Sequence, residues 1–238
     1  MTSPTHVFFD LGDTLLDLRG LVPAMEMLVG SRFPKLRSHA RKIAVDWVNK
    51  TVQFIQEASG QTFRPGTEIS AGALCATLNR GGSKVGFRTA LDLVRRAWGS
   101  YVNRAKFYDD VTPDLLTILH RQMNVIGIVT DSDASIMEPL IERLKIRNFF
   151  DLVVTSESVR AYKPDRRIFL AALRESGGTA EASVFVSDSI VDLRGAADVG
   201  MGTVWLRRRL EPEDAGQFYP GRAIANLADL PHVLGKQP

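Results

Sequence analysis

The stretch His6-Val-Phe-Phe-Asp-Leu-Gly-Asp-Thr-Leu-Leu16 decides how the rest of the chain is interpreted. Residues 7–9 are β-branched or aromatic and do not alternate with polar residues, which is typical of a strand buried on both faces of a parallel sheet. Asp10 then lies at the carboxyl end of that strand, where open α/β sheets bind their ligands. Taken alone, the stretch is equally well explained by a strand followed by a turn through Gly12 and Asp13.

The composition is that of an ordinary globular protein. The chain has 238 residues, of which 45% are hydrophobic and 24% charged, and its formal net charge is +3. No apolar run approaches the ~18 residues needed to span a bilayer, and a strand stands where a signal peptide would have its basic and apolar regions. We therefore expect a cytoplasmic protein without a membrane segment.

The charges are unevenly distributed along the chain. Residues 19–106 contain 15 Lys and Arg against 5 Asp and Glu, whereas the remainder contains 15 against 22. A basic segment beside an acidic one suits attraction of small anionic substrates towards a metal held by carboxylates, although a solvated helical surface has the same composition. Because no recognised motif indicates nucleic acid, we expect none as a partner. The sequence leaves open a monomer or a homodimer.

Helical periodicity follows Leu16 and continues for about ninety residues. Apolar residues recur at helical spacing in three stretches, near residues 36–59, 67–78 and 85–107, and the break at 80–83 separates the last two. No strand pattern interrupts them. We therefore expect residues 19–107 to form an all-helical insert.

Strands and helices alternate from residue 109 onwards. Repeated βα units of this length predict a doubly wound parallel sheet, so the fold class is α/β with an inserted helical domain. The expected strands are residues 125–130, 150–155, 184–187 and 203–206, and the expected helices are residues 112–122, 133–144, 164–175, 192–199 and 227–234.

Polar residues stand at or just beyond the carboxyl ends of several expected strands. Each alone has an ordinary explanation as the end of a strand, a surface lysine or a helix cap. In a parallel sheet these ends share one edge, so we expect the side chains to converge on one crevice. They are Asp10, Thr130, Asp131, Lys163, Asp188 and Asp192.

Four sequence motifs, taken in order, resemble those of the haloacid dehalogenase (HAD) superfamily, in the form with a helical cap inserted after the first strand. The resemblance implies a HAD/Rossmann-like core domain of residues 1–18 and 108–238 and a cap domain of residues 19–107 that closes over the crevice and selects the substrate. One motif alone is weak, whereas four at matching spacing are specific. The motifs are Phe9-Asp-Leu-Gly-Asp-Thr-Leu15, Ile128-Val-Thr130, Tyr162-Lys-Pro-Asp165 and Ser187-Asp-Ser-Ile-Val-Asp192, the last followed by Gly195-Ala196 and Gly200-Met201.

By this resemblance the chain is an Mg²⁺-dependent phosphatase of small phosphorylated metabolites. Asp10 would attack phosphorus to form an aspartyl phosphate, which water then hydrolyses. Thr130, the backbone N–H of Asp131 and the ammonium of Lys163 would bind the phosphoryl group. Asparagine is frequent in relatives at position 131, so the aspartate here adds negative charge near the phosphate unless it turns away.

The resemblance also implies a magnesium site. Asp10, the backbone carbonyl of Gly12 and Asp188 would hold the ion, with Asp192 as a further ligand or as a partner of the ligands. Many phosphatases of this superfamily have at position 12 an aspartate that protonates the leaving oxygen. Gly12 offers no such proton, and a positioned general acid contributes ~10²–10⁴-fold.

The missing acid leaves several interpretations open. The enzyme would be slow on alkyl phosphates, would favour good leaving groups such as acyl phosphates, or would borrow an acid from Asp13, the cap or the substrate. Outside phosphatase chemistry, one alternative is a metal-free haloacid dehalogenase that uses Asp10 on carbon. The other is a catalytically weak ligand-binding or regulatory protein.

Overall fold

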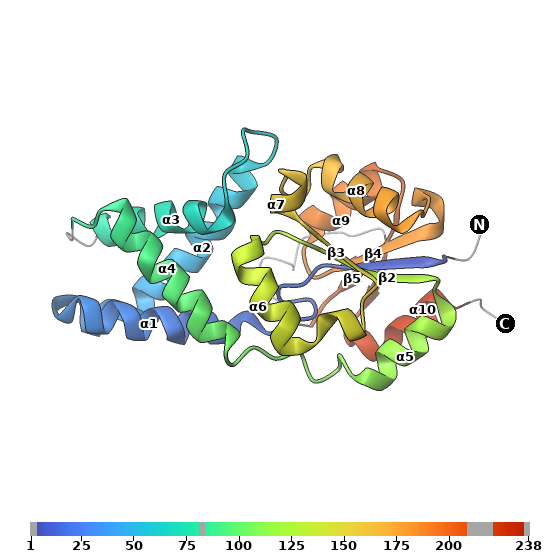
Figure 1. The fold of residues 1–238 in the computed structure, drawn as a ribbon, viewed down its shortest axis with the longest axis horizontal. Coiled ribbons are helices and arrows are strands. Elements are labelled where there is room, and N and C mark those ends of the chain that lie inside the picture. The colour runs from blue at the N-terminus through green and yellow to red at the C-terminus, as the bar shows by residue number, and fades with distance from the viewer. Residues whose placement is uncertain (1–3, 81–83, 209–220, 236–238) are drawn as a thin grey trace.

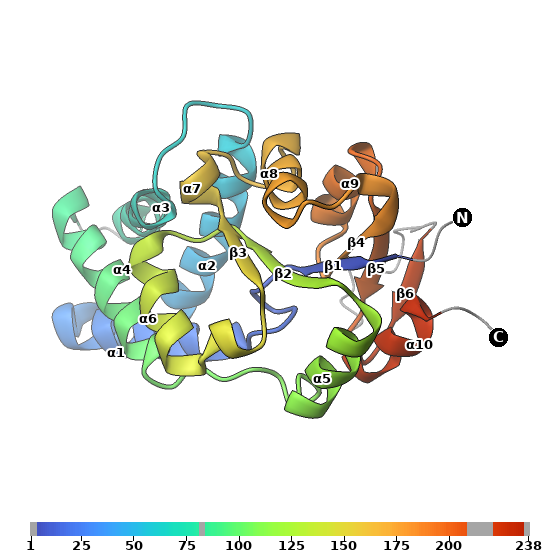
Figure 2. The same cartoon turned by 45° about the vertical axis from the view of Figure 1, so that its right-hand side comes forward.

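A parallel sheet forms the centre of the molecule. In the computed structural model, which describes residues 4–80, 84–208 and 221–235, this sheet has six strands in the order β3-β2-β1-β4-β5-β6 (Figure 1). The short strand β6 lies at one edge, beside α10 (Figure 2). The strands are β1 (His6–Phe9), β2 (Val125–Thr130), β3 (Leu152–Thr155), β4 (Ser183–Ser187), β5 (Gly202–Leu206) and β6 (Arg222–Ile224).

Helices cover both faces of the sheet, which is why β1 needs no polar face. Val7, Phe8 and Phe9 are all fully buried. Successive side chains of a strand point to opposite faces, so Phe8 packs with α8 and α9, and Val7 and Phe9 pack on the side of α5 and α10 (Figure 1). These helices are α5 (Pro113–Gln122), α8 (Arg166–Ser176), α9 (Ile190–Asp198) and α10 (Leu230–Leu234).

A group of helices lies between β1 and β2 in sequence and packs together beyond one end of the sheet (Figure 1). No strand occurs in the described part of residues 19–107. Helix α6 (Ala134–Leu144) contacts this group through α4, and α7 (Ser156–Val159) follows β3. The helices of the group are α1 (Leu21–Arg32), α2 (Ala40–Ala58), α3 (Gly66–Arg80) and α4 (Phe87–Val102).

Some elements differ from those expected. Helix α1 was not separately expected because its apolar residues lie on several sides, and β6 has only three residues, too few to show a pattern. Strand β3 begins at Leu152 because Asp151 bends the chain and its carboxylate accepts a hydrogen bond from the Ile126 N–H at 2.8 Å. Helix α3 ends at Arg80, and residues 81–83 lie outside the described residues.

The two chain segments that join the helical group to the sheet run side by side. The Asp17 N–H donates to the carbonyl of Lys106 at 3.2 Å, and the Tyr108 N–H donates to the carbonyl of Leu15 at 2.9 Å. These two hydrogen bonds restrict the movement of both segments more than the movement of a single unpaired segment would be restricted. The division into two domains stays a prediction.

A buried carboxylate links the helical group to the loop after β2. Asp133, only 2% exposed, accepts hydrogen bonds from the N–H of Gly66 at 2.7 Å and from the N–H and hydroxyl of Thr67, both at 2.8 Å. These donors begin α3, whose first N–H groups have no partner within the helix. The side chain of Asp133 therefore supplies the N-terminal cap of a helix that is 66 residues away in sequence.

Replacing Asp133 by alanine is expected to destabilise the fold, because buried donors of Gly66 and Thr67 lose their acceptor. We expect the free energy of unfolding to fall by about 1–3 kcal/mol, measured by urea denaturation. The matched control is Glu138→Ala, an exposed change on α6, which should stay within ~0.5 kcal/mol of the parent. Equal stability of the two variants would contradict this account of Asp133.

Candidate functional site

The strand ends meet at one cavity of about 290 Å³, which lies between the sheet edge and helices α2, α3 and α4. All the residues that sequence analysis assigned to a site line this cavity, although they come from separate parts of the chain. They are Asp10, Gly12, Thr130, Asp131, Lys163, Asp188 and Asp192.

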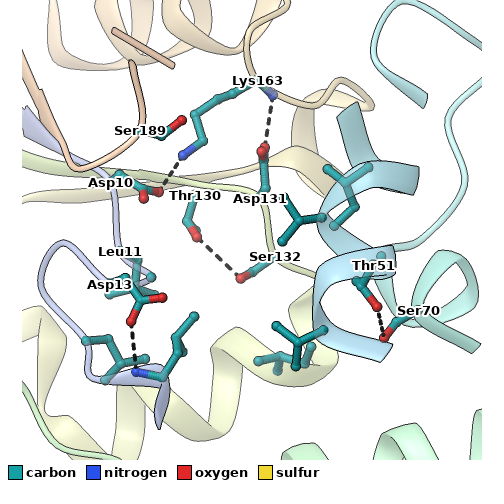
Figure 3. A pocket seen from close by; sticks show the side chains of 18 of the residues that line it. Asp10, Leu11, Asp13, Thr51, Ser70, Thr130, Asp131, Ser132, Lys163 and Ser189 are labelled. Carbon is teal, nitrogen blue, oxygen red and sulfur yellow. Dashed lines mark hydrogen bonds and ion pairs between the residues drawn. The ribbon is translucent and has the colours of Figure 1, made fainter. Parts of the chain in front are cut away.

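Lys163 connects the acids at the closed end of the cavity. Its ammonium donates to Asp10 Oδ1 (Figure 3). It also lies 2.7 Å from Asp192 Oδ2, and only 3% of the residue is exposed. Burial by itself would lower the pKa of Lys163, but the charges of Asp10 and Asp192 raise it above the usual range. Burial raises the pKa of Asp10, and the Lys163 ammonium opposes that rise.

Asp188 is fixed at the end of β4 by a hydroxyl from the first motif. Thr14 Oγ1 donates to Asp188 Oδ1 and accepts from the Asp188 N–H, both at 3.0 Å. On the other side, Trp205 Nε1 donates to the Asp188 carbonyl at 3.0 Å. Burial and the nearby charges of Asp10 and Asp13 raise the pKa of Asp188 to about 7.

Thr130 and Asp131 lie at the end of β2 and also line the cavity. Thr130 Oγ1 is 3.3 Å from Ser132 Oγ, within the cavity wall (Figure 3). Asp131 Oδ1 accepts the backbone N–H of Lys163 at 3.0 Å, so its carboxylate is directed at the lysine segment. Burial raises the pKa of Asp131 to about 7, against the attraction of the Lys163 charge.

The donor set of the cavity fits a magnesium ion. Among its described lining residues, six are aspartates and one, Lys163, is a cation, so the site carries excess negative charge. No group of three or more His, Cys, Asp or Glu in the described residues is arranged to hold a metal. Mg²⁺ commonly takes one or two carboxylates and completes its octahedron with waters and substrate oxygens, so Asp10, Asp188 and the Gly12 carbonyl would suffice.

Sequence reasoning did not assign a role to the residues that support the first motif from behind. Arg208 Nη2 donates to the Thr14 carbonyl at 2.7 Å, pairs with Asp110 and lies over the Tyr108 ring at 4.3 Å. The Tyr108 hydroxyl donates to Asp13 Oδ1 at 3.1 Å. Thr14 belonged to a recognisable motif, but no pattern in the sequence relates it to Arg208, which is 194 residues away.

Proteins related to this chain in sequence include phosphatases and haloacid dehalogenases. A family model described as haloacid dehalogenase-like hydrolase matches residues 4–200. The chain is 33% identical over 113 residues to pyrimidine 5'-nucleotidase YjjG of Escherichia coli (strain K12), which covers 47% of this chain and 50% of the relative. It is 40% identical over 105 residues, or 43% of this chain and 44% of the relative, to glyceraldehyde 3-phosphate phosphatase of Methanopyrus kandleri. The matches with the nucleotidase and this phosphatase thus span about half of each relative.

The dehalogenases match over a longer part of the chain at lower identity. An (S)-2-haloacid dehalogenase of Pseudomonas fluorescens is 23% identical over 230 residues, which covers 95% of this chain and 94% of the relative. The solved L-2-haloacid dehalogenase RSc1362 has a TM-score of 0.77 at 23% identity and covers 98% of this chain and 99% of its own. The magnesium-bound HAD-hydrolase YfnB of Bacillus subtilis has a TM-score of 0.77 at 20% identity with the same coverage. At these identities the structures establish the fold.

Replacing Arg208 by methionine is expected to leave Asp110 as a buried charge without its cation. We expect a loss of about 3–5 kcal/mol in the free energy of unfolding, measured by urea denaturation. Adding Asp110→Asn should recover much of that loss, because the amide is neutral and its oxygen still accepts the Leu227 N–H. Arg147→Met, at an exposed position, serves as the control. A double variant no more stable than Arg208→Met would contradict the prediction.

Proposed function

Because the chain belongs to the haloacid dehalogenase-like hydrolases, we propose that it is an Mg²⁺-dependent phosphatase that transfers a phosphoryl group of a small phosphorylated compound to Asp10 and then to water. The observation that carries the proposal is the excess of carboxylates around a single cation. Among the described lining residues, Asp10, Asp188 and Asp192 lie near the strand ends with Lys163 as the one cation, which suits a bound divalent cation and an anionic phosphoryl group together. This arrangement goes beyond what a metal-free reaction needs.

Asp10 is placed to act as the nucleophile. Lys163 binds its Oδ1, which leaves Oδ2 as the oxygen that would form the bond to phosphorus. The same ammonium, with the Thr130 hydroxyl nearby, would bind phosphoryl oxygens and hold them in line with Asp10. Asp192 keeps Lys163 oriented through the contact at 2.7 Å.

The magnesium ion would be held by Asp10, the Gly12 carbonyl and Asp188. When bound, it would offset the repulsion between the carboxylate of Asp10 and the phosphoryl oxygens. Thr14 keeps Asp188 directed towards the cavity by its two hydrogen bonds. The solved structure of YfnB, which has the same fold, is bound to magnesium. At 20% identity its likeness to this chain concerns the fold.

A second candidate is dehalogenation of a 2-haloacid, in which Asp10 attacks carbon and displaces halide. The match to an (S)-2-haloacid dehalogenase over 95% of the chain favours it. The presence of Asp188 and Asp192 disfavours this candidate, because attack on carbon with release of halide needs no cation site. Chloride release from 2-chloropropionate, with no phosphate release from any phosphate compound, would select this candidate over the phosphatase.

Asp10→Asn is expected to lower phosphate release by ~10³-fold or more, because an amide cannot accept the phosphoryl group. Purified protein would be assayed against nucleotides, sugar phosphates, p-nitrophenyl phosphate and acyl phosphates, with loss of activity in EDTA and recovery with Mg²⁺. Asp198→Asn, an exposed change at the end of α9, is the matched control. Activity that persists in Asp10→Asn would refute the role of Asp10 as the nucleophile. Activity that EDTA does not change would refute the requirement for a metal ion.

Binding of Mg²⁺ is expected to stabilise the protein through Asp188. At an Mg²⁺ concentration of about 100 Kd the gain is ~2.7 kcal/mol, which raises Tm by roughly 5–10 °C in a chain of this size. Asp188→Asn should abolish that rise without lowering Tm in EDTA, because it removes a repulsive charge next to Asp10. Differential scanning calorimetry with and without Mg²⁺ measures both. An equal Mg²⁺-dependent rise in the variant would show that Asp188 is not a ligand.

A further inference from the structure

The cavity above Asp10 has a polar end and an apolar end. The apolar end is lined by residues of α2, α4 and α6. Val48, Val52 and Ile55 follow helical spacing along α2, and Val52 is 51% exposed although it is apolar. The other residues of this end include Trp98 of α4 and Ile136 and Leu140 of α6. A ligand whose phosphoryl group reaches Asp10 therefore extends its other part over an aliphatic and aromatic surface.

The positive charge of the helical insert does not reach this surface. None of the Lys and Arg residues of segment 19–106 is among the described residues that line the cavity. Arg41 and Lys42, for example, pair with Glu26 and Asp46 at exposed positions of the helices. The attraction of small anions that the sequence suggested is thus limited to the Lys163 end. A second charged group on the substrate would be buried without a partner, at high cost.

Position 12 carries no acid, and the side chain of Leu18 lies next to it. A Cβ added to Gly12 would lie 2.8 Å from Leu18 Cδ1, the end of a flexible side chain, so an aspartate there would require that leucine to shift. Asp13 has a left-handed backbone conformation, with φ of 53°. Its carboxylate accepts hydrogen bonds from the Tyr108 hydroxyl and, at 3.4 Å, from the Leu18 N–H.

The helical insert does not supply the missing proton either. The residues that it contributes to the cavity wall, within the described chain, have apolar, hydroxyl or amide side chains and none is an acid, histidine, lysine or tyrosine. The nearest hydroxyls are already paired, since Thr51 Oγ1 lies 3.2 Å from Ser70 Oγ (Figure 3). Asp133 is engaged by the first N–H groups of α3. No side chain that the insert contributes to the described cavity wall is therefore placed to protonate the leaving group.

We propose that the substrate is an acyl phosphate whose acyl group is an aliphatic or aromatic chain bound against Val48, Val52 and Trp98. This assignment rests on the proposed phosphatase function and names its substrate class. Asp10 Oδ2 forms a bond to phosphorus while the bond from phosphorus to the acyl oxygen breaks, and the carboxylate leaves with the electron pair and needs no proton. Water then cleaves the aspartyl phosphate, and the products are the carboxylate, hydrogen phosphate and one proton.

The chemistry of this transfer is balanced without an acid. Donor and acceptor are both carboxylates, so the aspartyl phosphate is the same kind of mixed anhydride as the substrate. An alkyl phosphate would instead release an alkoxide beside Leu11 and Leu18, where burial of a charge without a partner is costly. The missing acid therefore favours the acyl class at the leaving group, and the apolar wall favours an apolar chain.

The first test compares matched acyl and alkyl phosphates, namely hexanoyl with hexyl phosphate and benzoyl with benzyl phosphate, as multiples of each compound's spontaneous hydrolysis. We expect the acyl member of each pair to be accelerated at least as much as the alkyl member is. Within the series from acetyl to hexanoyl phosphate, kcat/KM should rise about fourfold per methylene, which corresponds to ~0.8 kcal/mol for each buried CH₂. Faster turnover of alkyl, sugar or aryl phosphates would overturn the assignment.

The second test restores an acid and makes room for it. The double variant Gly12→Asp with Leu18→Ala should raise kcat/KM for hexyl phosphate by ~10²–10⁴-fold more than it changes kcat/KM for hexanoyl phosphate. Gly12→Asn with Leu18→Ala has the same shape without the proton and should show no such gain. A gain for the asparagine variant, or equal gains on both substrates, would show that the missing acid does not set the substrate class.

The third test probes the apolar wall at a position where the fold tolerates change. Val52→Asp, which places a charge in the wall, should remove the preference for longer acyl chains while acetyl phosphate is still hydrolysed. Val45→Asp, at an exposed valine of the same helix that does not line the cavity, is the control. A chain-length preference that survives Val52→Asp would overturn the binding mode. Absence of phosphate release from every compound, with no phosphorylated Asp10 by mass spectrometry, would instead reject the phosphatase function itself.

Discussion

The ammonium of Lys163 is the interaction on which the site depends. Without it, Asp10 and Asp192 would bring buried negative charge together with nothing to offset it. The lysine reaches this place because its own N–H is held by Asp131 at the end of the neighbouring strand. Lys163 thus connects the ends of β1 and β2 with the first turn of α9 and leaves a negative remainder that a divalent cation would offset.

Groups that take no part in the proposed reaction maintain this arrangement. Arg208 holds the Thr14 carbonyl, and the Thr14 hydroxyl holds Asp188, so a contact behind the sheet edge fixes a carboxylate inside the cavity. Asp133 performs a similar function on the opposite wall, where it caps α3. The position of the reactive groups is therefore a property of the tertiary structure and not of the motif loops alone.

The sequence was sufficient to predict the side chains that follow directly after strands. It was insufficient for side chains whose partners come from distant parts of the chain. Asp10, Thr130 and Asp188 follow buried strands, and a parallel sheet brings such ends together regardless of the intervening chain. The partnership of Arg208 with Thr14, or of Asp133 with α3, depends on how elements pack. The same holds for the insert, whose excess of basic residues was visible in the sequence although their location outside the cavity wall was not.

Gly12 and Leu18 illustrate how one exchange changes the demands on a whole reaction. With glycine at position 12, the proposed reaction lacks a proton for the leaving group, and it also lacks a base at that position to activate water against the phosphorylated Asp10. A good leaving group lets the phosphoryl transfer to Asp10 proceed without that acid. It does not accelerate the hydrolysis of the phosphorylated Asp10. In the proposed phosphatase, hydrolysis of the phosphorylated aspartate would then be the slower step.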